Sequence, residues 1–185
     1  MQLEYRRKIF HILLGIALSI IIFNVRKIYL VSIITGILCA GVLIRLLLLK
    51  GFEFKILAKF FINFGRPYEV GMGAMNFFVG VLLSLILPFP REYAAISVLI
   101  LGISDGLATI AGIASKYRIW NKKTFHGTTA FFISTYLILS IYMNSMISSL
   151  LISIGLTILE LFSPVDDNLL IPVAGTMLIS FMKLI

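Results

Sequence analysis

Hydrophobic residues along this chain fall into seven long runs, separated by charges, prolines or polar clusters. The runs cover residues 9–24, 28–49, 70–88, 92–115, 128–143, 145–163 and 168–184. Most are close to the roughly 20 residues that a helix needs to span a hydrocarbon core. The apolar residues are continuous and do not strictly alternate with polar ones, so the runs predict helices and not the strands of a membrane barrel. We therefore expect an all-α polytopic membrane protein of about seven transmembrane helices.

Two segments need separate interpretation. Residues 51–66, "GFEFKILAKFFINFGR", place aromatic and lysine side chains at helical spacing, which predicts an amphipathic helix lying in the membrane interface. The chain begins with basic residues and an apolar run, as a signal peptide does, but no small-residue cleavage pattern follows. We interpret this run as a retained first transmembrane helix. Because no repeat or linker is visible, residues 1–185 are expected to form a single integral membrane domain.

Composition supports the membrane assignment and narrows the class of partner. The chain has 185 residues, of which 60% are hydrophobic and 13% charged, and its mean hydropathy is +1.07. A soluble domain of this size could not bury so much apolar surface. The net charge of +8 fits basic cytoplasmic loops better than a nucleic-acid surface, so we expect no nucleic-acid partner. A single cysteine, Cys39, excludes an internal disulfide, and with two histidines a structural zinc site is not expected.

The distribution of lysine and arginine predicts the orientation. Eleven basic residues fall on the side of the N-terminus and four on the other, with Arg45 near the end of the second run. The larger group is Arg6, Arg7, Lys8, Lys50, Lys55, Lys59, Arg66, Lys116, Arg118, Lys122 and Lys123; the smaller is Arg26, Lys27, Arg91 and Lys183. The positive-inside rule then places the N-terminus and the loop 116–127 in the cytoplasm. Most acidic residues fall on the same side, which the rule does not require.

One acidic residue stands inside an apolar run. Asp105, in "SDGLATIAGIASKYRIWNKKTFHGTTA", carries a cost of roughly 2.5–3.5 kcal/mol at mid-helix, so such residues are rare and usually functional. The alternative is a structural role for Asp105, as a packing ion pair or as a protonated, hydrogen-bonded acid. Just beyond it, the loop 116–127 is either an ordinary positive-inside loop or a phosphate site. The second interpretation rests on Lys122 and Lys123, which precede a turn rich in hydroxyl and backbone donors that opens the next helix.

Two further polar groups lie at predicted helix ends. Asp166, Asp167 and Asn168 open the last run, where they could cap a helix or bind a hard cation, since Mg²⁺ prefers one or two carboxylates plus phosphate oxygens. On the first run, residues at helical spacing share one face: Glu4, Arg7, Lys8 and His11. This face is either a membrane-interface anchor or part of the same site. Carboxylates and lysines gathered on one membrane face suit a metal-bound polyphosphate held against a lipid. No P-loop or dinucleotide-binding fingerprint is present.

Three segments, in order and spacing, carry a resemblance to a known family. "RRKIFHILLG", "SDGLATIAGIASKYRIWNKKTFHGTTAFF" and "VDDNLLIPVAG" resemble the polyprenol kinase family of dolichol kinases, phytol kinases and CTP-dependent diacylglycerol kinases. That family is distantly similar to the phosphatidate cytidylyltransferases. The resemblance spans nearly the whole chain. It implies a multi-helix membrane kinase that uses CTP or another nucleotide, with Mg²⁺, to phosphorylate a lipid alcohol.

Motif matching implies roles for individual residues. The resemblance assigns catalysis to Asp105, Lys122, Lys123 and His126; binding of the nucleotide and its phosphates to Arg7, Lys8, His11, Gly106, Lys116, Gly127 and Thr128; and Mg²⁺ binding to Asp105, Asp166, Asp167 and Asn168. Three positions depart from the family pattern. Ser104 and Ser115 stand where glycine is common, and His126 stands where the family has glutamate.

The expected function is therefore that of a membrane kinase that transfers the terminal phosphate of CTP, or of another nucleotide, to a polyprenol or dolichol. Within the resemblance, phytol and diacylglycerol are alternative acceptors. A second enzyme class, a cytidylyltransferase that forms a CDP-lipid, would need a second phosphate site. A non-enzymatic alternative is an ion-coupled transporter in which Asp105 relays an ion, although the chain lacks inverted-repeat symmetry.

Overall fold

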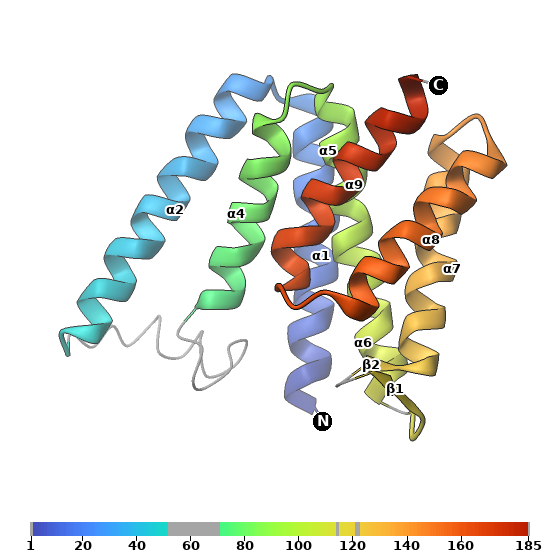
Figure 1. Cartoon of the computed structure of the whole chain (residues 1–185). Coiled ribbons are helices and arrows are strands. Elements are labelled where there is room, and N and C mark those ends of the chain that lie inside the picture. The colour runs from blue at the N-terminus through green and yellow to red at the C-terminus, as the bar shows by residue number, and fades with distance from the viewer. Residues whose placement is uncertain (1, 52–70, 114, 121–122, 185) are drawn as a thin grey trace.

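The computed structural model describes residues 2–51, 71–113, 115–120 and 123–184. In this part of the chain, long helices account for most of the residues, with one short strand pair (Figure 1). The helices are α1 (Gln2–Asn24), α2 (Lys27–Leu49), α4 (Met72–Ile86), α5 (Arg91–Ile100), η1 (Leu101–Asp105), α6 (Gly106–Ile113), α7 (Phe125–Tyr142), α8 (Met146–Phe162) and α9 (Asp167–Leu184); the strands are β1 (Arg118–Trp120) and β2 (Lys123–Thr124). The all-α prediction is confirmed for these residues.

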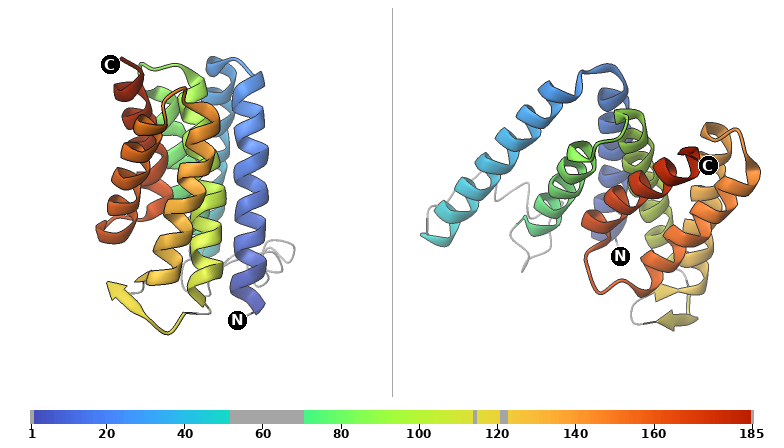
Figure 2. Two further views of the ribbon diagram at one scale, coloured as in Figure 1. Left: turned by 90° about the vertical axis from the view of Figure 1, so that its right-hand side faces the viewer. Right: turned by 45° about the horizontal axis from the view of Figure 1, so that its top comes forward.

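The helices form a bundle in which successive helices run in opposite directions (Figures 1 and 2). α5, the π-helical turn η1 and α6 follow one another without a break, so they act as one long helix at the centre. α1 packs against this central helix, α9 packs against both α4 and α5, and α7 packs against α6 and α8. α2 packs against α4 at one edge of the bundle. The N-terminus and the β1–β2 pair lie at the opposite end of the bundle from the C-terminus.

The helix boundaries follow local sequence signals. The Thr124 hydroxyl accepts a hydrogen bond of 3.2 Å from the backbone N–H of Gly127 and so caps α7. Ser145 caps α8 in the same way, through the backbone N–H of Ser148 at 3.3 Å. α4 ends just before Pro88, and Pro90 precedes α5. Each of the seven apolar runs of the sequence therefore corresponds to a helix or, for 92–115, to the continuous α5–η1–α6.

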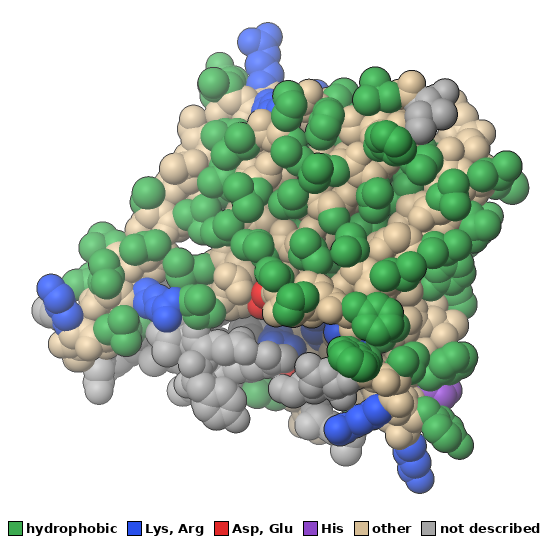
Figure 3. All heavy atoms as spheres, viewed as in Figure 1, with side chains coloured by type: hydrophobic (Ala, Val, Ile, Leu, Met, Phe, Trp, Pro, Cys, Tyr) green, Lys and Arg blue, Asp and Glu red, His purple; other side chains and the backbone are tan. Residues whose placement is uncertain are grey.

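The helices have the dimensions and surface of membrane-spanning segments. Within the described ranges, four stretches are long and apolar enough to cross a membrane: Gln2–Asn24, Lys27–Leu49, Arg91–Ile113 and Asp167–Leu184. α4 and α8 are also apolar but shorter. Large hydrophobic side chains such as Ile141, at 88% exposed, cover the outside of the bundle (Figure 3). A surface of this kind is stable against lipid tails and not against water, so the fold indicates a membrane protein.

The core between the helices contains many small polar residues. Hydroxyl groups on these helices return hydrogen bonds to the carbonyl four residues earlier, as Ser153 does to Ser149 at 2.6 Å and Thr176 to Pro172 at 2.7 Å. Such side chains satisfy their own polarity and allow helices to approach closely. The predicted interfacial helix at 51–66 lies, apart from Gly51, outside the described residues.

Candidate functional site

A cavity of about 520 Å³ opens at the end of the bundle that carries the N-terminus and the β1–β2 pair. Helices from distant parts of the sequence contribute to its wall: α1, η1, α6, α7, α8 and α9. The described lining is rich in charge, with four acidic and four basic side chains: Glu4, Asp105, Glu160 and Asp167, and Arg7, Lys8, Arg118 and Lys123. The formal charges of these eight cancel. A cluster of this density in a bundle with an apolar exterior marks the candidate site.

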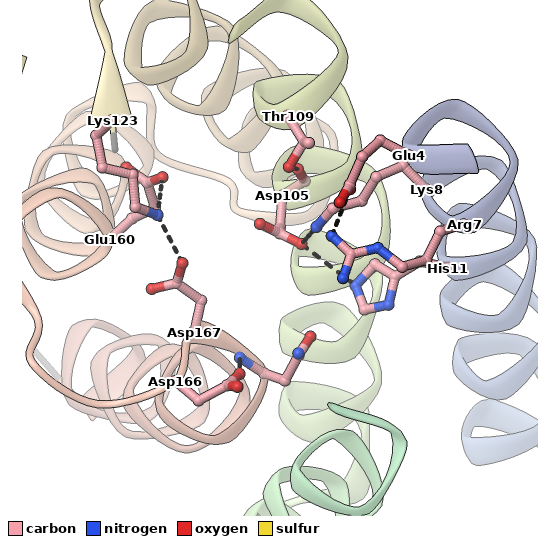
Figure 4. Close-up of polar contacts among 11 residues, drawn as sticks. Glu4, Arg7, Lys8, His11, Asp105, Thr109, Lys123, Glu160, Asp166 and Asp167 are labelled. Carbon is pink, nitrogen blue, oxygen red and sulfur yellow. Dashed lines mark hydrogen bonds and ion pairs between the residues drawn. The ribbon is translucent and has the colours of Figure 1, made fainter. Parts of the chain in front are cut away.

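Asp105 lies on one side of the cavity in an ion pair with α1 (Figure 4). Its carboxylate accepts a hydrogen bond from Lys8 Nζ, and His11 Nε2 lies 3.5 Å from the same oxygen. Asp105 is 6% exposed, so this charge is compensated by protein groups more than by water. It is the last residue of the π-helical turn η1, a feature that often occurs at functional sites.

The predicted polar face of α1 is directed toward this site. Arg7 pairs with Glu4 at 2.7 Å, and both line the cavity together with Lys8. His11 lies one turn deeper and packs edge-on against Phe77 of α4, with ring centroids 5.2 Å apart. α1 therefore contributes cationic groups to the cavity and does not act only as an anchor in the membrane interface.

A second cluster, which we call the Lys123 cluster, consists of Lys123, Glu160 and Asp167 (Figure 4). Lys123 Nζ donates hydrogen bonds to Glu160 Oε1 and to Asp167 Oδ2, the latter at 2.6 Å. The three side chains come from β2, α8 and α9, and all three line the cavity. Burial would lower the pKa of Lys123, but the carboxylates of Asp167 and Glu160 outweigh that effect and raise the pKa above its usual value. The ammonium therefore stays charged between two carboxylates.

The three polar residues that open α9, Asp166, Asp167 and Asn168, do not all face the cavity. Asp166 Oδ1 accepts a hydrogen bond of 2.9 Å from the backbone N–H of Asn168, which is the geometry of a helix cap, and Asp166 Oδ2 accepts one from Asn76 at 3.1 Å. Neither Asp166 nor Asn168 belongs to the cavity lining, whereas Asp167 does. The capping and cavity interpretations of this segment thus apply to different residues.

The other predicted residues differ in their relation to the cavity. Gly127 and Thr128, in the first turn of α7, line it. Gly106 is buried against α1, where a Cβ atom would overlap the side chain of Ile12. Lys116 is exposed and outside the lining, and Lys122 lies outside the described residues.

His126 is also outside the cavity lining. Its ring is exposed on α7, and Nδ1 lies 2.8 Å from the Ser115 hydroxyl. The position that the family resemblance assigned to catalysis is therefore not directed into the cavity formed by the described residues.

Glu160 is the main site residue that sequence reasoning did not select. It is 2% exposed, and its Oε2 is buried without a hydrogen-bond partner among the described residues. The criterion that singled out Asp105, an acid inside an apolar helix, applies equally to Glu160. Thr109, Gly112 and Arg118 also line the cavity; of these, Arg118 belongs to the basic loop 116–127 that the sequence indicated.

The donor set at the Lys123 cluster suits a hard divalent cation. Two carboxylates converge on one point, and a third oxygen, Glu160 Oε2, is buried and unused by described groups. Mg²⁺ is commonly bound through one or two carboxylates, with phosphate oxygens and water completing the octahedron. No group of three or more acidic, histidine or cysteine side chains in the described ranges is placed to hold a metal. The residues therefore fit a metal shared with a phosphate ligand, and not a cage built by protein alone.

Comparison with known proteins places the chain in a family. It is 35% identical over 175 residues to the uncharacterized protein MJ1137 of Methanocaldococcus jannaschii, and the match covers 91% of this chain and 88% of the relative. The chain belongs to the family of that archaeal protein. No protein-family model matches it, and no solved structure matches it either.

Proposed function

We propose that this protein is a membrane kinase that transfers the terminal phosphate of CTP, or of another nucleotide, to a lipid alcohol, with a polyprenol such as dolichol as the acceptor. One observation carries the proposal: two clusters of lysine and carboxylate, Lys8–Asp105 and the Lys123 cluster, line a single cavity at the polar end of an apolar bundle. The similarity of three sequence segments to the polyprenol kinases, described above, is consistent with it.

Phosphoryl transfer asks an enzyme to position two reactants and neutralise charge, and the cavity residues are suited to both tasks. Arg7, Lys8 and Lys123 offer cationic groups to phosphate oxygens, and Thr128 at the start of α7 adds a hydroxyl whose oxygen has no partner among the described residues. Mg²⁺, when bound at Glu160 and Asp167, would supply charge neutralisation at the phosphates.

Asp105 has the position expected of a base for the acceptor hydroxyl. It lies in the cavity wall, and Thr109 donates a hydrogen bond of 3.0 Å to its backbone carbonyl, while Lys8 orients its carboxylate. A base must lie within hydrogen-bond reach of the proton it removes. In this proposal the alcohol enters from the membrane beside the central helix, and its hydroxyl reaches the carboxylate of Asp105.

The proposal includes a topology. All seven helical segments cross the membrane, and the end that carries the cavity faces the cytoplasm, where nucleotides are available. The excess of lysine and arginine at that end supports this orientation.

The test is a transfer assay with purified protein in detergent. CTP labelled at the γ-phosphate or at the α-phosphate is incubated with Mg²⁺ and separately with dolichol, phytol and diacylglycerol. Label from the γ-position on the lipid supports a kinase, and the acceptor that is labelled defines the substrate. Label from the α-position, obtained with a lipid phosphate as the acceptor, would identify a cytidylyltransferase. The assay is repeated with ATP, GTP and UTP labelled in the same way, and no transfer from any of the four nucleotides would overturn the proposal and leave transport as the alternative.

A further inference from the structure

The Lys123 cluster has an unusual arrangement for a structural ion pair. One ammonium group is shared by two carboxylates, and Glu160, which is 2% exposed, presents a second oxygen that no described group satisfies. An unused carboxylate oxygen in a buried position is costly unless something binds it. Glu160 belongs to the lining of the cavity, so a ligand that enters there lies beside this side chain, and a small shift of the carboxylate would present the unpaired oxygen to it.

We propose that Glu160 and Asp167 form a divalent-cation site, and that Lys123 is a built-in cation which a metal ion displaces. The inference deepens the proposed function, on which it rests for the choice of Mg²⁺ as the biological ion. Glu160 is a new ligand in this assignment, since no sequence motif pointed to it. Asp166 is not part of the site, because its carboxylate caps α9 and contacts Asn76.

Charge balance gives the exchange a physical reason. The eight described charged side chains of the lining sum to zero, so this described part of the lining offers a polyphosphate no net positive charge. A divalent ion at Glu160 and Asp167 would neutralise both carboxylates and release the Lys123 ammonium. The freed lysine could then contact phosphate oxygens, which adds one cation to the ligand without moving a helix.

Lys123 is placed so that its side chain can move away from the two carboxylates without a change in the helices. It lies in the two-residue strand β2, immediately before the cap Thr124 of α7, and its side chain is 28% exposed. The two carboxylates are instead held on helices, Glu160 on α8 and Asp167 on α9. A long flexible side chain on a short strand can leave, while the two acids stay in place to bind the metal.

The test measures metal binding directly, without an activity assay. Mn²⁺ serves as a paramagnetic probe for a hard divalent site, and its binding to the purified full-length protein in detergent is followed by electron paramagnetic resonance. Glu160→Gln should weaken Mn²⁺ binding at least ten-fold while keeping an acceptor for Lys123. Lys123→Met should strengthen binding at least ten-fold, because no ammonium competes for the carboxylates.

Matched controls separate the site from a general charge effect. Glu92→Gln removes an acid that pairs with Arg91, outside the cavity lining, and Lys183→Met removes a lysine that stacks on Tyr142. Both should bind Mn²⁺ as the wild type does. If Lys123→Met does not fold, the comparison of Glu160→Gln with Glu92→Gln still decides the matter.

Three results would overturn the inference: equal Mn²⁺ affinity in Glu160→Gln and wild type, weaker binding in a folded Lys123→Met, or saturable binding in neither the wild type nor Lys123→Met. The outcome is independent of the kinase proposal. Mn²⁺ binding that depends on Glu160 without phosphate transfer would keep the site and reject the function. Phosphate transfer without Mn²⁺ binding that depends on Glu160 would keep the function and reject the site.

Discussion

Gly15 of α1 and Gly102 of η1 lie against each other with no space for a side chain between them. A Cβ atom on Gly15 would lie 2.6 Å from the Cα of Gly102, which is far inside normal contact distance. Small residues of this kind let helix backbones meet in a membrane. Lys8 is about two turns from Gly15 along α1, and Asp105 lies in the same π-helical turn as Gly102. The glycine contact therefore fixes the separation of Lys8 and Asp105.

Gly15→Ala should disturb this geometry. The added methyl group must push α1 away from η1, with a loss of about 1–3 kcal/mol in stability, and transfer activity should fall because Lys8 no longer reaches Asp105. Thermal unfolding in detergent and the transfer assay measure the two effects. Gly36→Ala on α2 is the control, since nothing lies within 4 Å of a Cβ atom there. Identical melting and activity for the two variants would show that the glycine contact has no such role.

Asp105→Asn tests the role proposed for Asp105. The amide keeps the shape of the side chain and can still accept a hydrogen bond from Lys8, but the buried Lys8 ammonium loses its counter-charge, so thermal stability should fall and activity is compared per folded protein. Transfer should be abolished because a neutral amide can neither take a proton nor bind a metal ion well. Glu92→Gln, outside the cavity, is the matched control. If Asp105 only forms a packing ion pair, stability falls in the same way but the folded variant keeps its transfer activity.

His126→Ala should retain activity, in contrast to Asp105→Asn, although motif matching assigned catalysis to both residues. The ring is exposed, contacts Ser115 and lies outside the cavity lining, so the variant should retain transfer activity within a few-fold of wild type. A loss as deep as that of Asp105→Asn would mean that α7 turns His126 into the cavity when the substrates bind. The measurement is the initial rate at saturating CTP and Mg²⁺.

The sequence predicted the elements of the fold well, because each helix is a continuous apolar run that ends at a cap, a charge or a proline. It also singled out Asp105, which lines the cavity, since the cost of a carboxylate in an apolar helix is a local property of the sequence. Helical spacing alone predicted that the polar residues of α1 share one face, but not the direction of that face. These inferences needed no knowledge of which helices are neighbours.

The sequence did not predict which side chains pair with one another across the cavity. The contact of Lys123 with Glu160 joins residues 37 positions apart, and its contact with Asp167 joins residues 44 apart, so neither follows from local spacing. Motif matching treated Asp166 and Asp167 alike because they are adjacent. The structure separates them, since successive helical residues point about 100° apart: Asp167 lines the cavity, whereas Asp166 caps α9.

That separation predicts different behaviour for two variants that remove the same charge. Asp167→Asn should raise the Mg²⁺ concentration needed for half-maximal transfer, because one of two carboxylate ligands is lost. Asp166→Asn should leave the Mg²⁺ dependence unchanged, because asparagine caps helices as well as aspartate does. Titration of Mg²⁺ in the transfer assay compares them. Equal shifts in both variants would contradict the assignment of Asp166 to the helix cap.

The proposed orientation can be tested by cysteine accessibility, because the chain has one cysteine, Cys39, that is free and can be replaced by serine. Tyr117, which is 75% exposed beside the cavity, and Asn144, exposed between α7 and α8, then serve as single cysteine positions at opposite ends of the bundle.

If the cavity faces the cytoplasm, a membrane-impermeant maleimide should label Asn144→Cys in right-side-out vesicles and Tyr117→Cys only in inside-out vesicles. The expectation rests on two independent arguments. The positive-inside rule predicts that the basic loop 116–127, which contains Tyr117, faces the cytoplasm, and in the proposed function nucleotides and Mg²⁺ enter from that side. Detergent-solubilised protein, in which both positions should react, controls for accessibility. Labelling of both positions in one type of sealed vesicle would mean that they lie on the same side of the membrane, which contradicts a membrane crossing by α7. The reversed pattern would place the cavity on the outer face, where cytoplasmic CTP cannot be the phosphate donor.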